Sequence, residues 1–160
     1  MAFLTSADGW LPESTPAQGQ RVLFRSTDGG VHWVQQVLAS PATVDLATTQ
    51  STTVSRPRFF GDAEGVLVLY AGTVDVAYTT DNRGASWVPA VPGSYTNVRF
   101  VSPMTGWAWA QDGQTGARAL VASGDGGQRW STLQMPAQRT PPFQLLGKGL
   151  GFLAGADALW

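Results

Sequence analysis

The chain has 160 residues, a formal net charge of −1 and only 13% charged residues, about half of the roughly 25% that is typical of soluble domains. Because there is no basic stripe and no apolar run of the roughly 20 residues needed to cross a bilayer, we expect neither a nucleic-acid partner nor membrane insertion. The chain contains no cysteine, which excludes disulfides and thiolate metal sites.

The first predicted unit covers residues 1–39. It opens on an inner strand at 1–4, with no charged or apolar leader ahead of it, so we expect no secretory signal within this chain. A Gly-aromatic turn follows at Gly9-Trp10, and an apolar strand at 21–24 leads into the octapeptide Ser-Thr-Asp-Gly-Gly-Val-His-Trp at 26–33. This order predicts a short antiparallel sheet.

The second predicted unit covers residues 56–92, and a Ser/Thr-rich link at 39–55 precedes it. The inner strand at 58–60, the turn Gly65-Val66 and the strand at 74–78 lead into a looser octapeptide at 80–87. The link has few large apolar residues, so we expect it to be exposed or mobile outside the core.

The third predicted unit, residues 96–136, repeats the same order and ends in the octapeptide at 123–130. An incomplete fourth unit at 142–160 holds only an inner strand at 143–146 and the turn Gly151-Phe152. Its last residues, Leu159-Trp160, match Leu23-Phe24, so the sequence stops about two residues short of a fourth octapeptide. We therefore expect either a piece of a longer repeat array or edges closed by another chain.

The octapeptides share a turn chemistry. Ser, Thr and Asp oxygens accept backbone N–H groups, glycine supplies a positive φ, and the Trp ring can fold back over the turn. In the middle copy Asn82 takes the aspartate position without a gap, and Asp81 takes it if one residue is inserted. We assign a structural turn role to Ser26, Asp28, Gly30, Trp33, Thr80, Asp81, Asn82, Gly84, Trp87, Ser123, Asp125, Gly127 and Trp130.

Four antiparallel strands in each repeat predict the blade of a β-propeller. The chain is then one all-β domain over 1–160 with about three and a half blades, at 1–39, 56–92, 96–136 and, incomplete, 142–160. We expect a partial or open propeller, whose remaining blades come from a missing part of the chain or from another chain.

The pattern Ser/Thr-x-Asp-x-Gly-x-x-Trp resembles the Asp-box, or BNR, repeat of sialidase-type propellers, with two full matches and one degenerate match. Together with the Gly-Trp element it most resembles the branch related to the photosystem II assembly and stability factor. This resemblance implies a binding or assembly scaffold that is not an enzyme. It also implies an extracytoplasmic location, whether periplasmic, lumenal or secreted, and a protein or glycan partner.

Sialidases and xyloglucanases share the octapeptide, so the alternative is one part of a glycan-hydrolysing propeller. An arginine cluster is conceivable where inner strands start, but the sialidase Phe/Tyr-Arg-Ile-Pro motif is absent and no tyrosine has a recognisable nucleophile context. One Asp per turn lacks the convergent oxygens that calcium needs. His32, expected on a solvent-facing strand, cannot form a metal site or a catalytic triad alone. We therefore predict no catalytic residue, metal or cofactor.

Loops on a rigid scaffold are where binding residues gather. In a propeller the octapeptide turns lie on one face, and the connections between blades and between second and third strands lie on the other. We expect a ligand or partner on the face opposite the octapeptides, and the candidate ligand-facing residues are Arg56, Arg58, Arg99, Asp112 and Arg118.

Overall fold

The structure is a computed structural model that describes residues 1–12, 22–41, 52–72, 74–91, 93–134, 143–145 and 151–153. Within these ranges the regular structure consists of β-strands in antiparallel sheets, without a helix. The predicted all-β class is therefore confirmed. No helix that could cross a membrane is found among the described residues.

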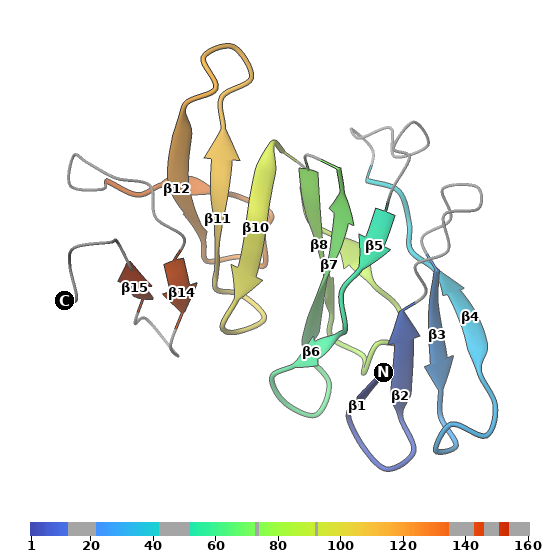
Figure 1. The fold of residues 1–160 in the computed structure, drawn as a ribbon. Helices are drawn as coiled ribbons and strands as arrows, with labels where there is room; N and C mark the ends of the chain where they lie inside the picture. Colours follow the sequence, from blue (N-terminus) through green and yellow to red (C-terminus); the bar gives the residue numbers. More distant parts are fainter. Residues whose placement is uncertain are drawn as a thin grey trace.

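The first thirteen strands form three antiparallel sheets, and neighbouring strands follow the chain order apart from β5 and β6, which both pair with β7 (Figure 1). Blade 1 contains β1 (Ala2–Phe3), β2 (Gly9–Pro12), β3 (Val22–Ser26) and β4 (Val34–Val37). Blade 2 contains β5 (Thr52–Val54), β6 (Arg58–Phe59), β7 (Gly65–Ala71), β8 (Val74–Thr80) and β9 (Val88–Pro89). Blade 3 contains β10 (Tyr95–Phe100), β11 (Gly106–Gln111), β12 (Arg118–Ser123) and β13 (Ser131–Thr132).

A two-stranded sheet follows, made of β14 (Phe143–Leu145) and β15 (Gly151–Leu153). It corresponds to the inner strand and Gly-aromatic strand that the sequence predicts for the fourth unit. The residues after it, 154–160, lie outside the described residues, so the expected strand at Leu159-Trp160 stays a prediction.

The inner strand of blade 2 begins earlier than the sequence indicates and is interrupted. β5 pairs with the far end of β7 and β6 pairs with its start. Between them Pro57 has no N–H to donate to a ladder, and the Ser55 hydroxyl accepts the Val68 N–H at 2.8 Å. Val54 of β5 is buried at 5% exposure, which makes it an exception to the expected exposure of 39–55. Residues 42–51 of that link lie outside the described residues.

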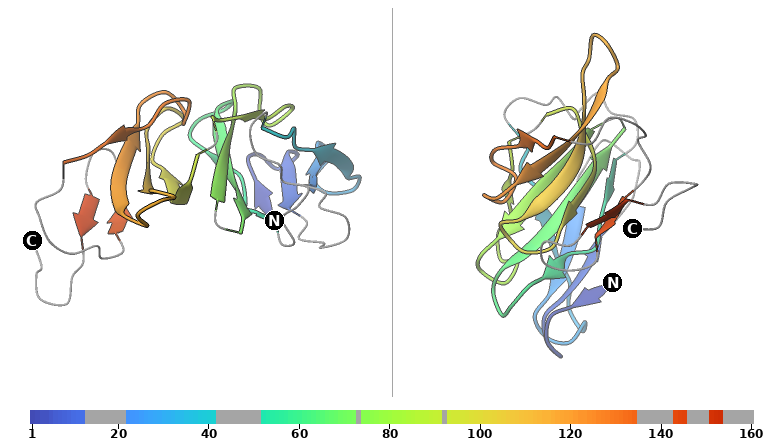
Figure 2. Two further views of the ribbon diagram at one scale, coloured as in Figure 1. Left: turned by 90° about the horizontal axis from the view of Figure 1, so that it is seen from above. Right: turned by 90° about the vertical axis from the view of Figure 1, so that its left-hand side faces the viewer.

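The blades stand side by side along an open arc, with β1, β6 and β10 on the same edge (Figure 2). Apolar side chains fill the two spaces between blades. Trp10 and Leu23 of blade 1 pack with Leu67 and Tyr78 of blade 2, and a second cluster joins blades 2 and 3. The core therefore lies between sheets, because each sheet buries both faces wherever it has two neighbours.

Candidate functional site

The three octapeptide turns have the same hydrogen bonds. The first hydroxyl, from Ser26, Thr80 or Ser123, accepts the N–H of the residue four places later, at 2.8, 3.0 and 2.8 Å. The same hydroxyl donates to the side-chain oxygen two places later, at 2.8, 2.9 and 3.0 Å. All three hydroxyl residues are buried, so the hydroxyl is the inner anchor of each turn.

Asn82, and not Asp81, occupies the aspartate position of the middle turn. Its Oδ1 accepts the Ser86 N–H at 3.0 Å, as the Asp28 Oδ1 accepts the His32 N–H at 2.9 Å. The ungapped alternative is therefore the one that the fold adopts. Asp81 is exposed.

Hydrogen bonds stabilise the charged form of the turn carboxylates. The N–H and side chain of His32, with the Ser26 hydroxyl, hold the pKa of Asp28 well below its usual value. The Arg129 N–H lowers the pKa of Asp125. His32 is solvent-facing, as expected, but it lies in the turn and not on a strand. Neither aspartate belongs to a metal-binding cluster, because the described residues contain no group of three or more His, Cys, Asp or Glu side chains that could hold a metal ion.

The turn glycines have the expected positive φ, +93° at Gly30, +66° at Gly84 and +88° at Gly127. The Trp33 indole donates to the Gly30 carbonyl at 2.9 Å, so that ring lies over its own turn. The atoms nearest to a Cβ added at Gly84 belong to Trp10 of blade 1, at 2.8 Å, and Trp87 lies in the core between the blades.

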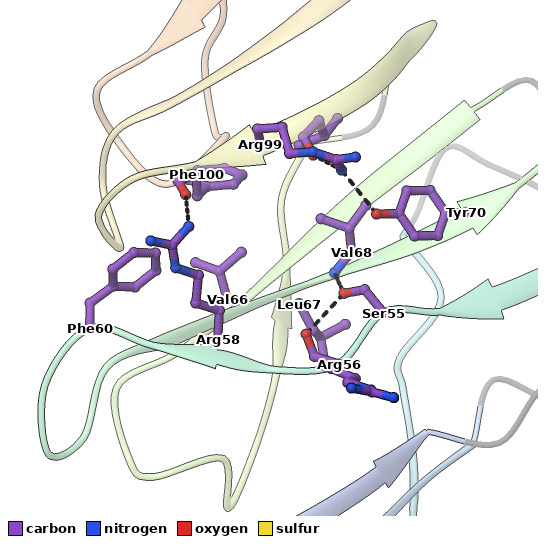
Figure 3. A pocket seen from close by; sticks show the side chains of 11 residues that line it. Ser55, Arg56, Arg58, Phe60, Val66, Leu67, Val68, Tyr70, Arg99 and Phe100 are labelled. Atoms are coloured by element: carbon purple, nitrogen blue, oxygen red, sulfur yellow. Dashed lines mark hydrogen bonds between the residues drawn. The ribbon is translucent and has the colours of Figure 1, made fainter. Parts of the chain in front are cut away.

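A cleft of about 190 Å³ lies between blades 2 and 3, on the edge where β6 and β10 face each other (Figure 3). Arg56, Arg58 and Arg99 line it, and all three are exposed. The fold thus brings together three of the five candidate ligand-facing residues. Arg99 is the fifth residue of β10 and so lies near the end of that inner strand, not at its start as expected.

Two of these arginines bridge the blades. The Arg58 Nη1 donates to the Phe100 carbonyl at 3.2 Å, and its guanidinium lies 4.9 Å from the Phe60 ring centroid. The Arg99 Nη1 donates to the Tyr70 hydroxyl at 3.1 Å. The two guanidinium groups are therefore held in place by the opposite wall of the cleft (Figure 3).

A bulge in β10 sets the direction of Arg99. The register with β11 shifts between Thr96 and Arg99, and Asn97 has a φ of +55°. The Asp75 carboxylate of blade 2 accepts the Val98 N–H at 3.2 Å inside this bulge. Because bulges re-aim the side chains beside them, Asp75 acts through the backbone as a positioning residue for Arg99.

Asp75 is 8% exposed, and its burial raises the pKa of the carboxyl. The backbone N–H groups of Val98 and Asn97, and then the charge of Arg99, oppose that rise. The carboxyl is thus buried and satisfied by backbone donors. An acidic residue within the apolar run 74–78 was a visible signal for such a role, but the sequence does not show which backbone it meets.

Asp112 and Arg118 lie at the loop between β11 and β12, at the other end of blade 3 from its octapeptide turn (Figure 1). Asp112 accepts the N–H groups of Gln114 and Thr115 at 2.9 and 2.7 Å. These bonds, with that from the Thr115 hydroxyl, lower the pKa of the carboxyl. Its oxygen therefore closes a local turn, apart from the arginine cleft.

The arginine cleft also contains polar and aromatic side chains that the sequence pattern did not single out, namely those of Tyr70, Phe60 and Ser55.

No protein-family model matches the sequence, and no curated protein matches it. Solved structures do. YCF48 bound to D1 peptide matches with a TM-score of 0.50 and 20% identity, over 82% of this chain and 37% of that one. YCF48 from Cyanidioschyzon merolae matches with a TM-score of 0.50 and 17% identity, over 82% and 38%.

At these identities the match shows the fold, a β-propeller, of which this chain forms three blades and a two-stranded sheet. The chain spans less than two fifths of the length of either solved protein.

Proposed function

We propose that this chain is part of a non-enzymatic Asp-box propeller that binds an extended, carboxylate-bearing protein segment at the arginine cleft. The observation that carries the proposal is the cleft itself. It gathers Arg56, Arg58 and Arg99, and its lining residues include no Asp or Glu. An excess of fixed positive charge favours an acidic ligand.

The guanidinium groups keep donors for such a ligand. The hydrogen bonds that Arg58 and Arg99 donate to described residues all use Nη1, and a guanidinium has five N–H donors in a planar fork. The edge formed by Nε and Nη2 therefore remains to pair with a carboxylate in bidentate geometry. The contacts to Phe100 and Tyr70 reduce the entropy lost when a ligand binds.

The size of the cleft favours a side chain or a terminal carboxylate over a larger ligand. About 190 Å³ is small beside the roughly 300–1,000 Å³ of a typical small-molecule pocket. The cleft runs from Phe60, beside the β6–β7 turn, to Tyr70, near the β7–β8 end. A segment leaving past Tyr70 reaches the face opposite the octapeptides, where Asp112 and Arg118 lie.

The comparisons support a protein partner, since one matching propeller is YCF48 bound to D1 peptide. Resemblance of the repeat to the photosystem II assembly and stability branch supports the same role. On that resemblance we place the module outside the cytoplasm, in a periplasm or lumen or as a secreted protein.

One contact favours the glycan-hydrolysing alternative. The Tyr70 hydroxyl accepts a hydrogen bond from Arg99, and sialidases combine an arginine cluster with a tyrosine nucleophile. The cleft lining offers no carboxylate to act as general acid or base, so binding is the better supported function. Incubation with fluorogenic sialosides and β-glucans should give no turnover. Turnover that disappears in Tyr70→Phe would replace the binding proposal.

Binding is tested by fluorescence anisotropy with a labelled D1 peptide as the probe. Arg58→Gln and Arg99→Gln should each weaken binding roughly 10- to 100-fold, since a hydrogen bond to a charged group contributes about 1.5–3 kcal/mol. Arg129→Gln is the matched control, an exposed arginine outside the cleft. Equal affinities for all four proteins, or an equal loss in the control, would contradict the proposal.

A further inference from the structure

A second groove between blades 2 and 3 lies on the octapeptide face, at the end of the sheets that carries the β6–β7 and β10–β11 turns (Figure 1). It encloses about 250 Å³ and shares no lining residue with the arginine cleft. Its lining includes Glu64, Asp81 and Val88 from blade 2, and Met104 and Asp125 from blade 3. The groove is therefore a separate site, formed where two neighbouring blades meet.

A backbone hydrogen bond fixes the blade 3 side of the groove and makes its residues comparable with those of the other blades. The Gly126 N–H donates to the Met104 carbonyl at 2.9 Å, which ties the octapeptide turn to the β10–β11 turn. Each position of the groove therefore has a counterpart in the gap between blades 1 and 2. The equivalent bonds, each of 2.9 Å, join Gly29 to Ala7 in blade 1 and Arg83 to Ala63 in blade 2.

The Glu64 carboxylate lacks the partner that its counterpart has. In blade 1 the equivalent residue is Asp8, and the Arg25 Nη2 donates to its carboxylate at 3.3 Å. At the Arg25 position blade 2 has Thr79, a neutral residue. Within the described part of the chain, no hydrogen bond or ion pair joins the Glu64 side chain to another residue. The charge of Glu64 is therefore available to a ligand.

The octapeptide turns that border the groove make it more acidic. Asp125 stands where blade 2 has the neutral Asn82, and Gly126 stands where blade 2 has Arg83. Hydrogen bonds hold the pKa of Asp125 below its ordinary value, so this carboxyl is ionised at neutral pH. Asp81 adds a third carboxylate, and the lining residues include no Lys or Arg.

Apolar side chains border the same groove. Val88 and Met104 are 58% and 55% exposed, and Met104 stands where blades 1 and 2 have alanine. The stem of a lysine or arginine side chain can cover such apolar surface while its charged head reaches a carboxylate. About 250 Å³ is below the roughly 300–1,000 Å³ of a typical small-molecule pocket. The groove therefore suits one long side chain better than a whole small molecule.

We infer that this groove binds a lysine or arginine side chain, with apolar residues beside it, on a segment of a partner protein. Glu64 and Asp81 are exposed and accept hydrogen bonds from the cationic head, while Val88 and Met104 pack against its stem and the neighbouring apolar residues. Complementary charge selects this ligand and rejects an acidic one. Because the arginine cleft has the opposite charge, the two sites recognise different segments, and neither depends on a ligand at the other.

Chemical-shift mapping on the isotope-labelled chain tests the site. The probe is an acetylated and amidated pentapeptide with a central lysine between leucines. The backbone amides of Asp81, Val88, Met104 and Gly126 should shift the most. A pentapeptide with glutamate in place of the lysine should bind about tenfold more weakly or worse, because like charges repel across an interface. Equal affinities for the two peptides would overturn the inference, and so would the same shifts on addition of calcium chloride alone.

Paired variants separate the groove from the net charge of the chain. Glu64→Gln with Asp81→Asn should weaken binding of the lysine peptide roughly threefold or more, as expected for the loss of two exposed ion pairs. Asp62→Asn with Asp112→Asn is the matched control, because it also removes two exposed carboxylates but leaves the groove lining unchanged. Unchanged affinity in the groove variant, or an equal loss in both, would contradict the inference. Arg58→Gln should bind the lysine peptide as wild type does, which distinguishes this site from the arginine cleft.

Discussion

Replacing Ser123 by alanine removes the inner anchor of the third octapeptide turn. The Ser123 hydroxyl accepts the Gly127 N–H at 2.8 Å and donates to Asp125 at 3.0 Å. Ser123 is 4% exposed and Gly127 is buried. In Ser123→Ala the Gly127 N–H loses its acceptor and cannot turn to water, so the variant carries an unsatisfied buried donor.

Leaving a buried donor unsatisfied costs about 1–3 kcal/mol. In a protein of this size each kcal/mol lowers the melting temperature by roughly 2–4 °C, so a fall of roughly 2–12 °C is expected. Differential scanning calorimetry measures it. Ser123→Thr should keep the wild-type stability, because Thr80 makes the same bonds in the middle turn.

Ser131→Ala is the matched control, since Ser131 is an exposed serine on the edge strand β13 and should change stability by no more than about 0.5 kcal/mol. An unchanged melting temperature in Ser123→Ala would refute the reasoning. An equal fall of the melting temperature in Ser131→Ala would also refute it, because the loss would then not depend on the burial of the hydroxyl.

Three further predictions concern the turns and the bulge. The pKa of Asp125 is lowered in the folded state, so the ionised carboxylate stabilises the fold above pH 3.8, the ordinary pKa, and this stabilisation is lost as the pH falls further. Asp125→Asn copies Asn82 of the middle turn and has no charge to lose. In melting curves from pH 7 to pH 2 it should therefore lose less stability on acidification than wild type. Asp75→Ala should cost about 1–3 kcal/mol in urea unfolding, because it leaves the Val98 N–H unpaired. Asp75→Asn keeps an acceptor without a buried charge, and since the raised pKa makes ionisation costly, this variant should be at least as stable as wild type at pH 7. A variant Asp75→Asn as unstable as Asp75→Ala would reject this account. Gly84→Ala should lose more stability than Gly116→Ala, because both glycines have a positive φ but only at Gly84 would the new Cβ meet the Trp10 ring. The positive φ alone costs about 1–2 kcal/mol in either variant. Equal losses of stability would count against the packing argument.

The turns and sheets were predictable because their causes are local. The octapeptide carries its own acceptors and flexible glycines within eight residues, so Ser26, Thr80 and Ser123 could be assigned before any contact between blades was known. The strand predicted at 74–78 likewise corresponds to β8.

The cleft depends on contacts between blades, which no local pattern encodes. Pro57 interrupts the inner strand, so the sequence does not indicate that the strand resumes upstream at Thr52–Val54. The bulge at Asn97 shifts Arg99 by comparison with its place in a regular strand. The bond from Arg99 to Tyr70 joins residues 29 positions apart. The sequence therefore singled out the arginines, while their partners and their direction came from the packing of blade 2 against blade 3.

Mapping the bound peptide on the protein by NMR tests the central claim most directly. In a titration of isotope-labelled chain with the D1 peptide, the backbone amides of Ser55, Arg56, Arg58–Phe60, Val68–Tyr70 and Val98–Phe100 should shift the most, since these segments line the arginine cleft. Arg58→Gln with Arg99→Gln should abolish those shifts. Shifts centred on the octapeptide turns, or shifts that persist in the double variant, would contradict the account.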